Sequence, residues 1–243
     1  MSYQAEYTAS IENPEAFWAD KARALNWYRA PQQVLSTDEN RIDRWFADGE
    51  LNTAYLALDV HLEQGRGDQT ALIYDSPVTG QAQRYSYREL TDQVARFAGV
   101  LKAQGVEKGD RVVIYMPMIP EAVIAMLAVA RLGAVHSVVF GGFAAPELAV
   151  RIEDAEPRVV VTASCGIEVD KLIPYKPLLD DAIVRSSHKP QSCVVFQRPQ
   201  VVAQMVPGRD LDWEEAMAQA EPADCVPVKG TDPLYILYTS GTT

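Results

Sequence analysis

Short apolar runs alternate with longer amphipathic stretches along most of the chain. Short runs rich in Val and Ile are typical of buried strands, whereas apolar residues three or four apart indicate one face of a helix. The pattern predicts strands over residues 70–74, 112–116, 135–140, 158–162, 192–196 and 234–238, the last of them buried. It predicts helices from 87 to a stop at Gly105, and over 120–132, 146–154, 175–186 and 213–219.

This alternation indicates βαβ units, so we expect an α/β fold with a mostly parallel sheet flanked by helices. Local signals agree with the pattern. Ser86 and Glu89 have capping-box spacing, Asp212 is placed to cap the last helix, and Arg84-Tyr85 completes a hairpin with the strand at 70–74.

The first 65 residues have a different character. Asn13 followed by Pro14 is a helix start, and three of the four tryptophans lie in this segment. We expect residues 1–65 to form a helical and irregular arm that wraps a larger body over residues 66–243. A small independent helical subdomain is the alternative, and too few residues remain there to build a core of its own.

Composition narrows the class of protein. Apolar residues make up 48% of the 243 residues, and the formal net charge is −11. That charge argues against broad binding to nucleic acid or to an anionic membrane, which both require a basic face. A local cationic site for a small anion remains compatible with it.

Three cysteines are too few and too far apart for a disulfide framework or a zinc site: Cys165, Cys193 and Cys225. The first residues lack the pattern of a secretory signal, and Pro117, Pro120 and Glu121 divide the most apolar stretch into a strand and a helix. We therefore expect reduced thiols and a cytoplasmic protein, in a bacterium or a similar reducing compartment.

HSVVFGGFAAPEL, residues 136–148, is the first stretch with chemical potential. A strand runs into two glycines and then a helix, and ligands of parallel sheets bind beyond the carboxyl ends of strands. Phe140 and Phe143 offer rings on which a purine can stack. Glycine turns are common, however, so the motif alone favours a tight turn with both rings in the core.

YTSGTT, residues 238–243, is more specific because it follows a predicted strand directly. Its hydroxyl side chains and backbone N–H groups can surround an anion. The stretch lacks the lysine of a P-loop, and a plain turn is an equally common outcome for such a string. The three histidines lie far apart, without carboxylates at metal-ligand spacing, so we expect no metal site.

Taken together, VVFGGF, IEDAEPRVVVT, IPYKPLLD and DPLYILYTSGTT resemble the N-terminal part of AMP-forming short-chain acyl-CoA synthetases. NPEAFWADKARALNWY resembles the N-terminal extension of these enzymes, and the resemblance covers essentially the whole chain. Within the group, CGIEVDKLIPYKPLLDDAI is most similar to propionyl-CoA synthetase.

The resemblance implies a two-step reaction. A carboxylate attacks the α-phosphate of ATP to give acyl-AMP and pyrophosphate, and CoA then displaces AMP. It implies ATP and CoA as substrates, Mg²⁺ accompanying ATP, and small molecules as the only partners. The residues it assigns to the β- and γ-phosphates of ATP are Thr239, Ser240, Gly241, Thr242 and Thr243. Those it assigns to CoA are Phe140, Gly141, Gly142, Lys171, Ile173 and Pro174.

One departure from the family pattern concerns the CoA phosphate. Acetyl-type relatives have arginines just before the Ile-Pro pair, whereas this chain has Glu168 and Lys171 there. Lys171 can serve as a point charge, but Glu168 repels a phosphate. The difference favours the propionate branch.

The resemblance further implies that the chain is cut within its phosphate loop, so that residues 66–243 form an incomplete AMP-binding domain without catalytic residues. We expect the isolated chain to be inactive. The alternatives are a fragment of an acetate–CoA ligase, a non-catalytic module that binds CoA or a nucleotide, and an assembly module whose exposed apolar surface causes self-association.

Overall fold

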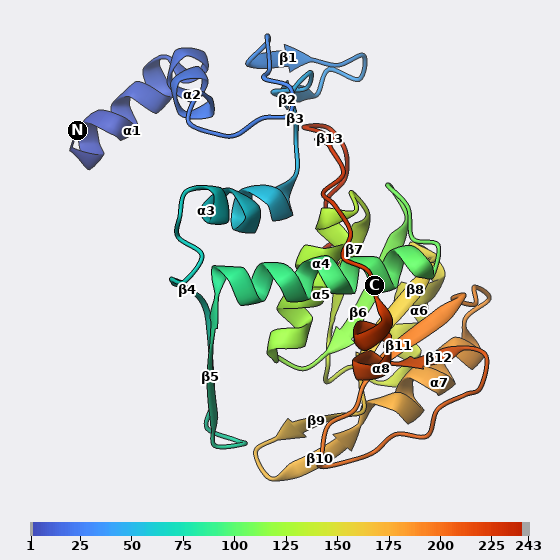
Figure 1. Ribbon diagram of the computed structural model, residues 1–243. Helices are drawn as coiled ribbons and strands as arrows, with labels where there is room; N and C mark the ends of the chain where they lie inside the picture. Colours follow the sequence, from blue (N-terminus) through green and yellow to red (C-terminus); the bar gives the residue numbers. More distant parts are fainter. Residues whose placement is uncertain (1, 240–243) are drawn as a thin grey trace.

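A computed structural model describes residues 2–239 and has an all-parallel five-stranded sheet at its centre (Figure 1). The strand order is β12-β11-β8-β6-β7. The strands are β6 (Arg111–Met116), β7 (Val135–Phe140), β8 (Val159–Ala163), β11 (Ser192–Phe196) and β12 (Asp210–Asp212). The α/β class and the parallel sheet that the apolar pattern predicted are therefore confirmed.

Helices cover both faces of this sheet. On one face lie α4 (Tyr87–Ala103), α5 (Pro120–Arg131) and α8 (Trp213–Gln219), which share one buried cluster with Val112, Ile114 and Val161 of the strands. On the other lie α6 (Ala145–Ala155) and α7 (Tyr175–Arg185), packed against Val113, Tyr115 and Val160. Alternate residues of a strand point to opposite faces, so β6, β8 and β11 each contribute to both clusters.

The predicted helix starts are confirmed in detail. The Ser86 hydroxyl accepts a hydrogen bond from Glu89 N while the Glu89 carboxylate accepts from Ser86 N, which is the capping box. The Asp212 carboxylate accepts from the backbone of Glu214 and Glu215 at the start of α8. The Asn13 side chain accepts from Ala16 N, and α2 (Pro14–Ala22) begins at the following proline.

Two-stranded ribbons complete the body. The expected hairpin is present as β4 (Thr70–Ser76) and β5 (Gln81–Ser86), which pair antiparallel. A second hairpin, β9 (Cys165–Glu168) with β10 (Lys171–Pro174), was not predicted. Neither were α1 (Tyr3–Glu12), η1 (Tyr55–Asp59), α3 (Val60–Glu63) and the ribbons β1–β2 (Leu35–Thr37, Asp43–Trp45) and β3–β13 (Glu50–Leu51, Val228–Lys229).

The prediction of a buried strand over residues 234–238 is wrong. This segment makes one parallel bridge to β7, in which Ile236 N donates to His136 O over 2.9 Å. Tyr235 is 55% exposed and Leu237 70% exposed. The segment runs along the edge of the sheet beside β7, and none of the described strands pairs with its outer side. Every second side chain therefore faces solvent.

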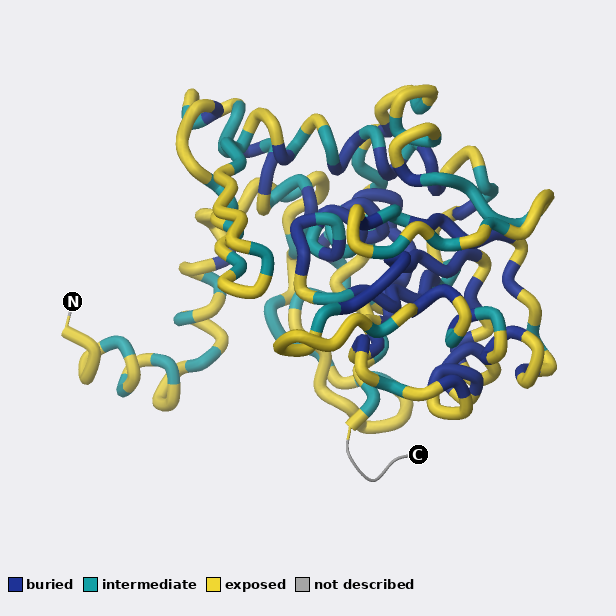
Figure 2. The backbone as a smooth tube through the Cα atoms, turned by 90° about the horizontal axis from the view of Figure 1, so that it is seen from below, coloured by how far each residue is buried: buried dark blue, intermediate teal, exposed yellow. Residues whose placement is uncertain are grey.

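Helices α1 and α2 stand away from the sheet (Figures 1 and 2), and α1 has no buried residue. The later part of the N-terminal segment holds the body firmly. The buried Asn52 side chain donates to the carbonyls of Ala130, Arg131 and Val226, and Arg131 forms an ion pair of 2.7 Å with Asp59. A division of the chain at residue 65 stays a prediction. Within residues 2–239, no helix has the length and apolar character needed to cross a membrane.

We expect Asn52→Ala to lower the free energy of unfolding by about 2–4 kcal/mol, because it removes the buried side-chain donor to three carbonyls and the acceptor of Tyr55 N. Urea denaturation followed by circular dichroism measures the change. Asn40→Ala is the matched control, since Asn40 is exposed and should change stability by less than about 0.5 kcal/mol. Equal effects of the two substitutions would contradict the anchoring role of Asn52.

Candidate functional site

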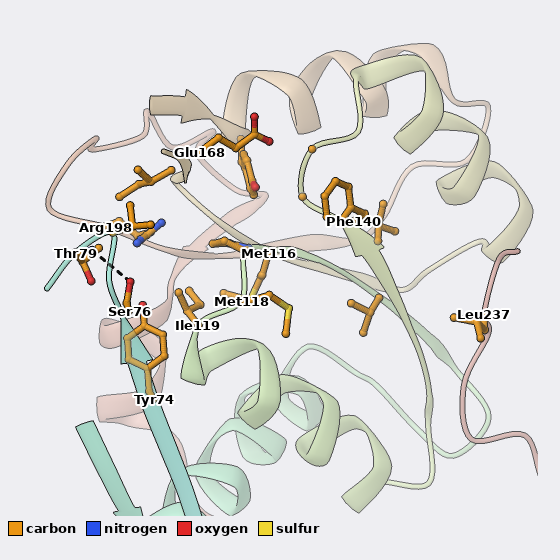
Figure 3. A pocket seen from close by; sticks show the side chains of 18 residues that line it. Tyr74, Ser76, Thr79, Met116, Met118, Ile119, Phe140, Glu168, Arg198 and Leu237 are labelled. Carbon is orange, nitrogen blue, oxygen red and sulfur yellow. Dashed lines mark hydrogen bonds between the residues drawn. The ribbon is translucent and has the colours of Figure 1, made fainter. Parts of the chain in front are cut away.

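A cavity of about 530 Å³ opens beyond the carboxyl ends of β6 and β7, where ligands of parallel sheets bind (Figure 3). Met116 ends β6 and Phe140 ends β7, and both line the cavity. The turn of the β4–β5 hairpin, the β9–β10 hairpin and the loop after β11 contribute the other walls. The predicted location of the site is therefore a real concavity.

Tyr175, the first residue of α7, fixes the geometry of this region. Its ring is 4% exposed and packs on the ring of Tyr115, with the centroids 4.8 Å apart. A Cβ atom on Gly141 would lie 2.2 Å from the Tyr175 hydroxyl oxygen, and one on Gly166 would lie 2.3 Å from it. The ring thus fills a slot between two backbone segments that only glycine allows.

The Phe140 side chain points outward from this slot. It is 70% exposed, so the interpretation of a turn with both phenylalanine rings in the core is wrong for Phe140. Phe143 is half-buried and packs against the α6–α7 side of the core, beneath the guanidinium of Arg151 at 4.4 Å. An exposed aromatic ring beside two glycines is the arrangement that stacking of a planar ligand requires.

The residues assigned to CoA by resemblance fall into two groups. Phe140, Gly141 and Gly142 line the cavity together. The others lie on β10, outside the lining: Lys171 is exposed opposite Glu168, Ile173 packs towards the α6–α7 core, and Pro174 precedes α7. The structure brings the first group together and places the second one strand away.

Of the predicted phosphate-binding residues, only Thr239 is described. It borders a second cavity of about 460 Å³, which it shares with Phe140, Arg151 and Tyr238. The Tyr238 hydroxyl donates to Asp154 over 2.5 Å, and burial together with this carboxylate raises the Tyr238 pKa. Ser240, Gly241, Thr242 and Thr243 lie outside the described residues, so the anion nest stays a prediction.

Two charged residues line the main cavity: Glu168, which the sequence had indicated as a departure from the family pattern, and Arg198, which it had not indicated as functional. Arg198 follows β11 and is 7% exposed, and Glu168 ends β9. Burial is the main cause of the raised pKa of Tyr175 between them, Glu168 raises that pKa further, and Arg198 lowers it. The only signal for Arg198 was its place just after a predicted strand. No group of three or more potential metal-ligating side chains occurs within residues 2–239.

His136 lies where the edge segment meets β7. It is 8% exposed, its Nδ1 has no hydrogen-bond partner, and its ring stacks on that of Tyr235 with the centroids 5.8 Å apart. Burial lowers the pKa of His136 from 6.5 to about 4. The imidazole is therefore neutral near pH 7, and the segment leading to Thr239 contacts β7 through stacking of the Tyr235 ring on this uncharged imidazole.

We expect Gly166→Ala to lower the free energy of unfolding by about 1–3 kcal/mol, because the new methyl group displaces the Tyr175 ring. Gly67→Ala is the matched control. Its methyl group meets only the guanidinium end of Arg88, whose exposed side chain can move away, so we expect a change below about 0.5 kcal/mol. Urea denaturation of both variants provides the comparison, and a stable Gly166→Ala protein would exclude the slot.

We expect His136→Gln to weaken the loss of stability on acidification. The unfolded chain binds a proton at His136 near pH 6.5 and the folded chain only near pH 4, so this contribution is present above pH 6.5 and is lost as pH falls towards 4. Between pH 7 and pH 5 the variant should lose about 1.5–2 kcal/mol less than the unaltered protein. Parallel pH profiles of urea midpoints would show that His136 is not the group responsible.

Two family models match successive parts of the chain. Residues 3–57 match the acetyl-coenzyme A synthetase N-terminus, and residues 59–243 match the AMP-binding enzyme model. The match begins almost at the start of the chain and passes through the described cavity.

Individual relatives agree with the family models. An uncharacterized protein of Pseudomonas aeruginosa is 62% identical over 243 residues, which are 100% of this chain and 39% of that protein. The human mitochondrial acyl-CoA synthetase short-chain family member 3 is 50% identical over 99% of this chain and 35% of its own length. A solved structure, acetoacetyl-CoA synthetase from Streptomyces lividans, has a TM-score of 0.87 and 28% identity over 100% of this chain and 37% of its own.

The chain thus spans less than two-fifths of the length of these relatives. Its fold, its cavity and a continuous family match over residues 59–243 lead to one conclusion. This chain belongs to the family of AMP-binding enzymes.

Proposed function

We propose that this chain is the N-terminal portion of an AMP-forming propionate–CoA ligase. The whole enzyme converts propionate, ATP and CoA into propionyl-CoA, AMP and pyrophosphate through propionyl-AMP. The observation that supports this most is the unbroken succession of the two family matches over residues 3–57 and 59–243. The exposed Phe140 ring beside Gly141 and Gly142 supplies a surface of the kind a nucleotide base needs.

The chain contributes binding groups to this reaction. Thr239 and the four residues after it hold the β- and γ-phosphates, where hydroxyl and N–H donors stabilise the charge that develops on pyrophosphate. Phe140, Gly141 and Gly142 receive the CoA adenine, with Ile173, Pro174 and Lys171 behind them. Mg²⁺ enters with ATP as part of the substrate. The acid–thiol ligation itself uses groups outside this chain.

The proposal also includes a preference for propionate and a location in the cytoplasm. Glu168 and Lys171 replace the arginines of acetyl-type relatives, which favours propionate over acetate. The name of one matching model, the acetyl-coenzyme A synthetase N-terminus, keeps acetate as the alternative. The three cysteines form no disulfide with one another, which suits a reducing compartment. The partners are small molecules, and self-association of the isolated chain stays a prediction.

Exchange of labelled pyrophosphate into ATP by the full-length protein tests the proposal. We expect exchange that depends on propionate, with kcat/KM for propionate roughly tenfold or more above that for acetate, since one methylene is worth about 10–200-fold. The 243-residue chain alone, and the full-length protein without carboxylate, are the controls and should give no exchange. A preference for acetate would replace propionate by the alternative substrate. Absence of exchange with every carboxylate, together with CoA binding in calorimetry, would indicate a non-catalytic module.

A further inference from the structure

Arg198 is a buried cation without a carboxylate partner. Arg198 is 7% exposed. Within residues 2–239, no carboxylate oxygen lies within 4.0 Å of its guanidinium nitrogens, the limit for an ion pair. By contrast, the other buried cations, Arg131, Arg151 and Lys176, each have one. A guanidinium is always protonated, and a buried charge left unpaired is costly. This exception therefore indicates that Arg198 is suited to bind an anion.

Two hydrogen bonds, one from the backbone and one from the guanidinium, hold Arg198 in place. Arg198 N donates to the Ser164 hydroxyl over 2.8 Å, and Nη1 donates to Cys165 O over 3.1 Å. No other hydrogen bond of the guanidinium is made within the described chain, although the side chain lines the cavity. Burial raises the pKa of Glu121, and the charge of Arg198 has a small opposing effect on that pKa. The remaining donors of Arg198 are thus available to a ligand in the cavity.

Uncharged hydrogen-bonding groups accompany Arg198 at the same end of the cavity. Ser76 and Thr79 come from the turn of the β4–β5 hairpin, and Figure 3 draws them beside Arg198. The Thr79 hydroxyl is buried and has no hydrogen-bond partner. The Ser76 hydroxyl accepts from Thr79 N over 3.3 Å and keeps its own proton to donate. A guanidinium flanked by hydroxyl donors is the donor set that phosphate groups prefer.

The acidic group of the cavity lies at a different place. A Cβ atom on Gly142 would lie 3.3 Å from Glu168 Oε1 and 2.7 Å from the Phe140 ring, so Glu168 belongs with the aromatic end. There a carboxylate can accept from an amino group on a stacked base. The cavity therefore has an aromatic and acidic end and a cationic, hydroxyl-lined end.

We propose that Arg198, with Thr79 and Ser76, binds a phosphate group of CoA whose base stacks at Phe140. This rests on the proposed function of the chain. It assigns the phosphate to a cation inside the cavity, because Lys171 lies outside the lining and Glu168 repels an anion. The phosphate is either the 3′-phosphate of the ribose or the diphosphate.

Steady-state kinetics of the full-length protein with CoA and with dephospho-CoA tests the proposal. We expect Arg198→Gln to raise KM for CoA by roughly tenfold to a hundredfold, the loss of a hydrogen bond to a charged group. If the 3′-phosphate is the partner, the variant no longer distinguishes the two thiols. If the diphosphate is the partner, KM rises equally for both. Unchanged KM for both thiols overturns the proposal.

Pyrophosphate exchange separates failure of this proposal from failure of the proposed function. The exchange needs no CoA, so Arg198→Gln should retain the exchange rate of the unaltered protein. The matched surface control, Arg185→Gln, should retain both the exchange rate and KM for CoA. Normal exchange with an unchanged KM refutes only the role of Arg198. Absence of exchange in the unaltered protein refutes the ligase itself.

Two further variants keep the test decisive if Arg198→Gln does not fold. Arg198→Lys retains the charge and should raise KM for CoA less than Arg198→Gln does. Thr79→Val removes only the unpartnered hydroxyl and should raise KM severalfold without changing exchange. A KM for CoA that stays constant in both of these folded variants also overturns the proposal.

Discussion

The Tyr175 ring, wedged between Gly141 and Gly166, is the contact on which the site depends. It joins three elements that are separate in the sequence: the turn after β7, strand β9 and the start of α7. Close packing means that a side chain at either glycine has nowhere to go. Because the slot holds the β7 turn inward at Gly141, the preceding Phe140 side chain is directed out into the cavity. Core packing at Tyr175 and ligand access at Phe140 are thus two consequences of one arrangement.

The parallel sheet explains why charged and aromatic groups from distant parts of the sequence meet at this edge. All five strands have their carboxyl ends on the same side, so the loops after β6, β7 and β11 converge there. Arg198 and Phe140 are 58 residues apart along the chain, yet they line one cavity. The hairpins β4–β5 and β9–β10 then close the edge laterally and add hydroxyl groups and a carboxylate.

The spacing of apolar residues and the helix-capping signals were sufficient to predict the central sheet and its helices. Strands such as β6 and β8 are buried on both faces and so are continuous apolar runs, and helices such as α4 have local start signals. They failed where tertiary contacts decide. The segment at 234–238 has the composition of a buried strand but lies on the sheet edge, and in the β9–β10 hairpin Gly166 packs against the distant Tyr175 ring. In the site, the two glycines after a predicted strand indicated Phe140. Nothing near Arg198 in the sequence indicates that its side chain is buried without a carboxylate partner.

The charge of the chain makes a buried cation more useful than an exposed one. At a net charge of −11 the surface repels anionic ligands at long range, but salt screens exposed charges beyond about 8–10 Å. The charge of an exposed residue such as Lys171 is screened by salt in this way, and Lys171 also lies opposite the negative charge of Glu168 in the β9–β10 hairpin. Arg198 is instead shielded by the protein, where the effective dielectric constant is lower and its attraction for a phosphate is stronger. An acidic protein can therefore bind a polyanionic ligand provided that the cation is inside the cavity and already fixed by backbone contacts.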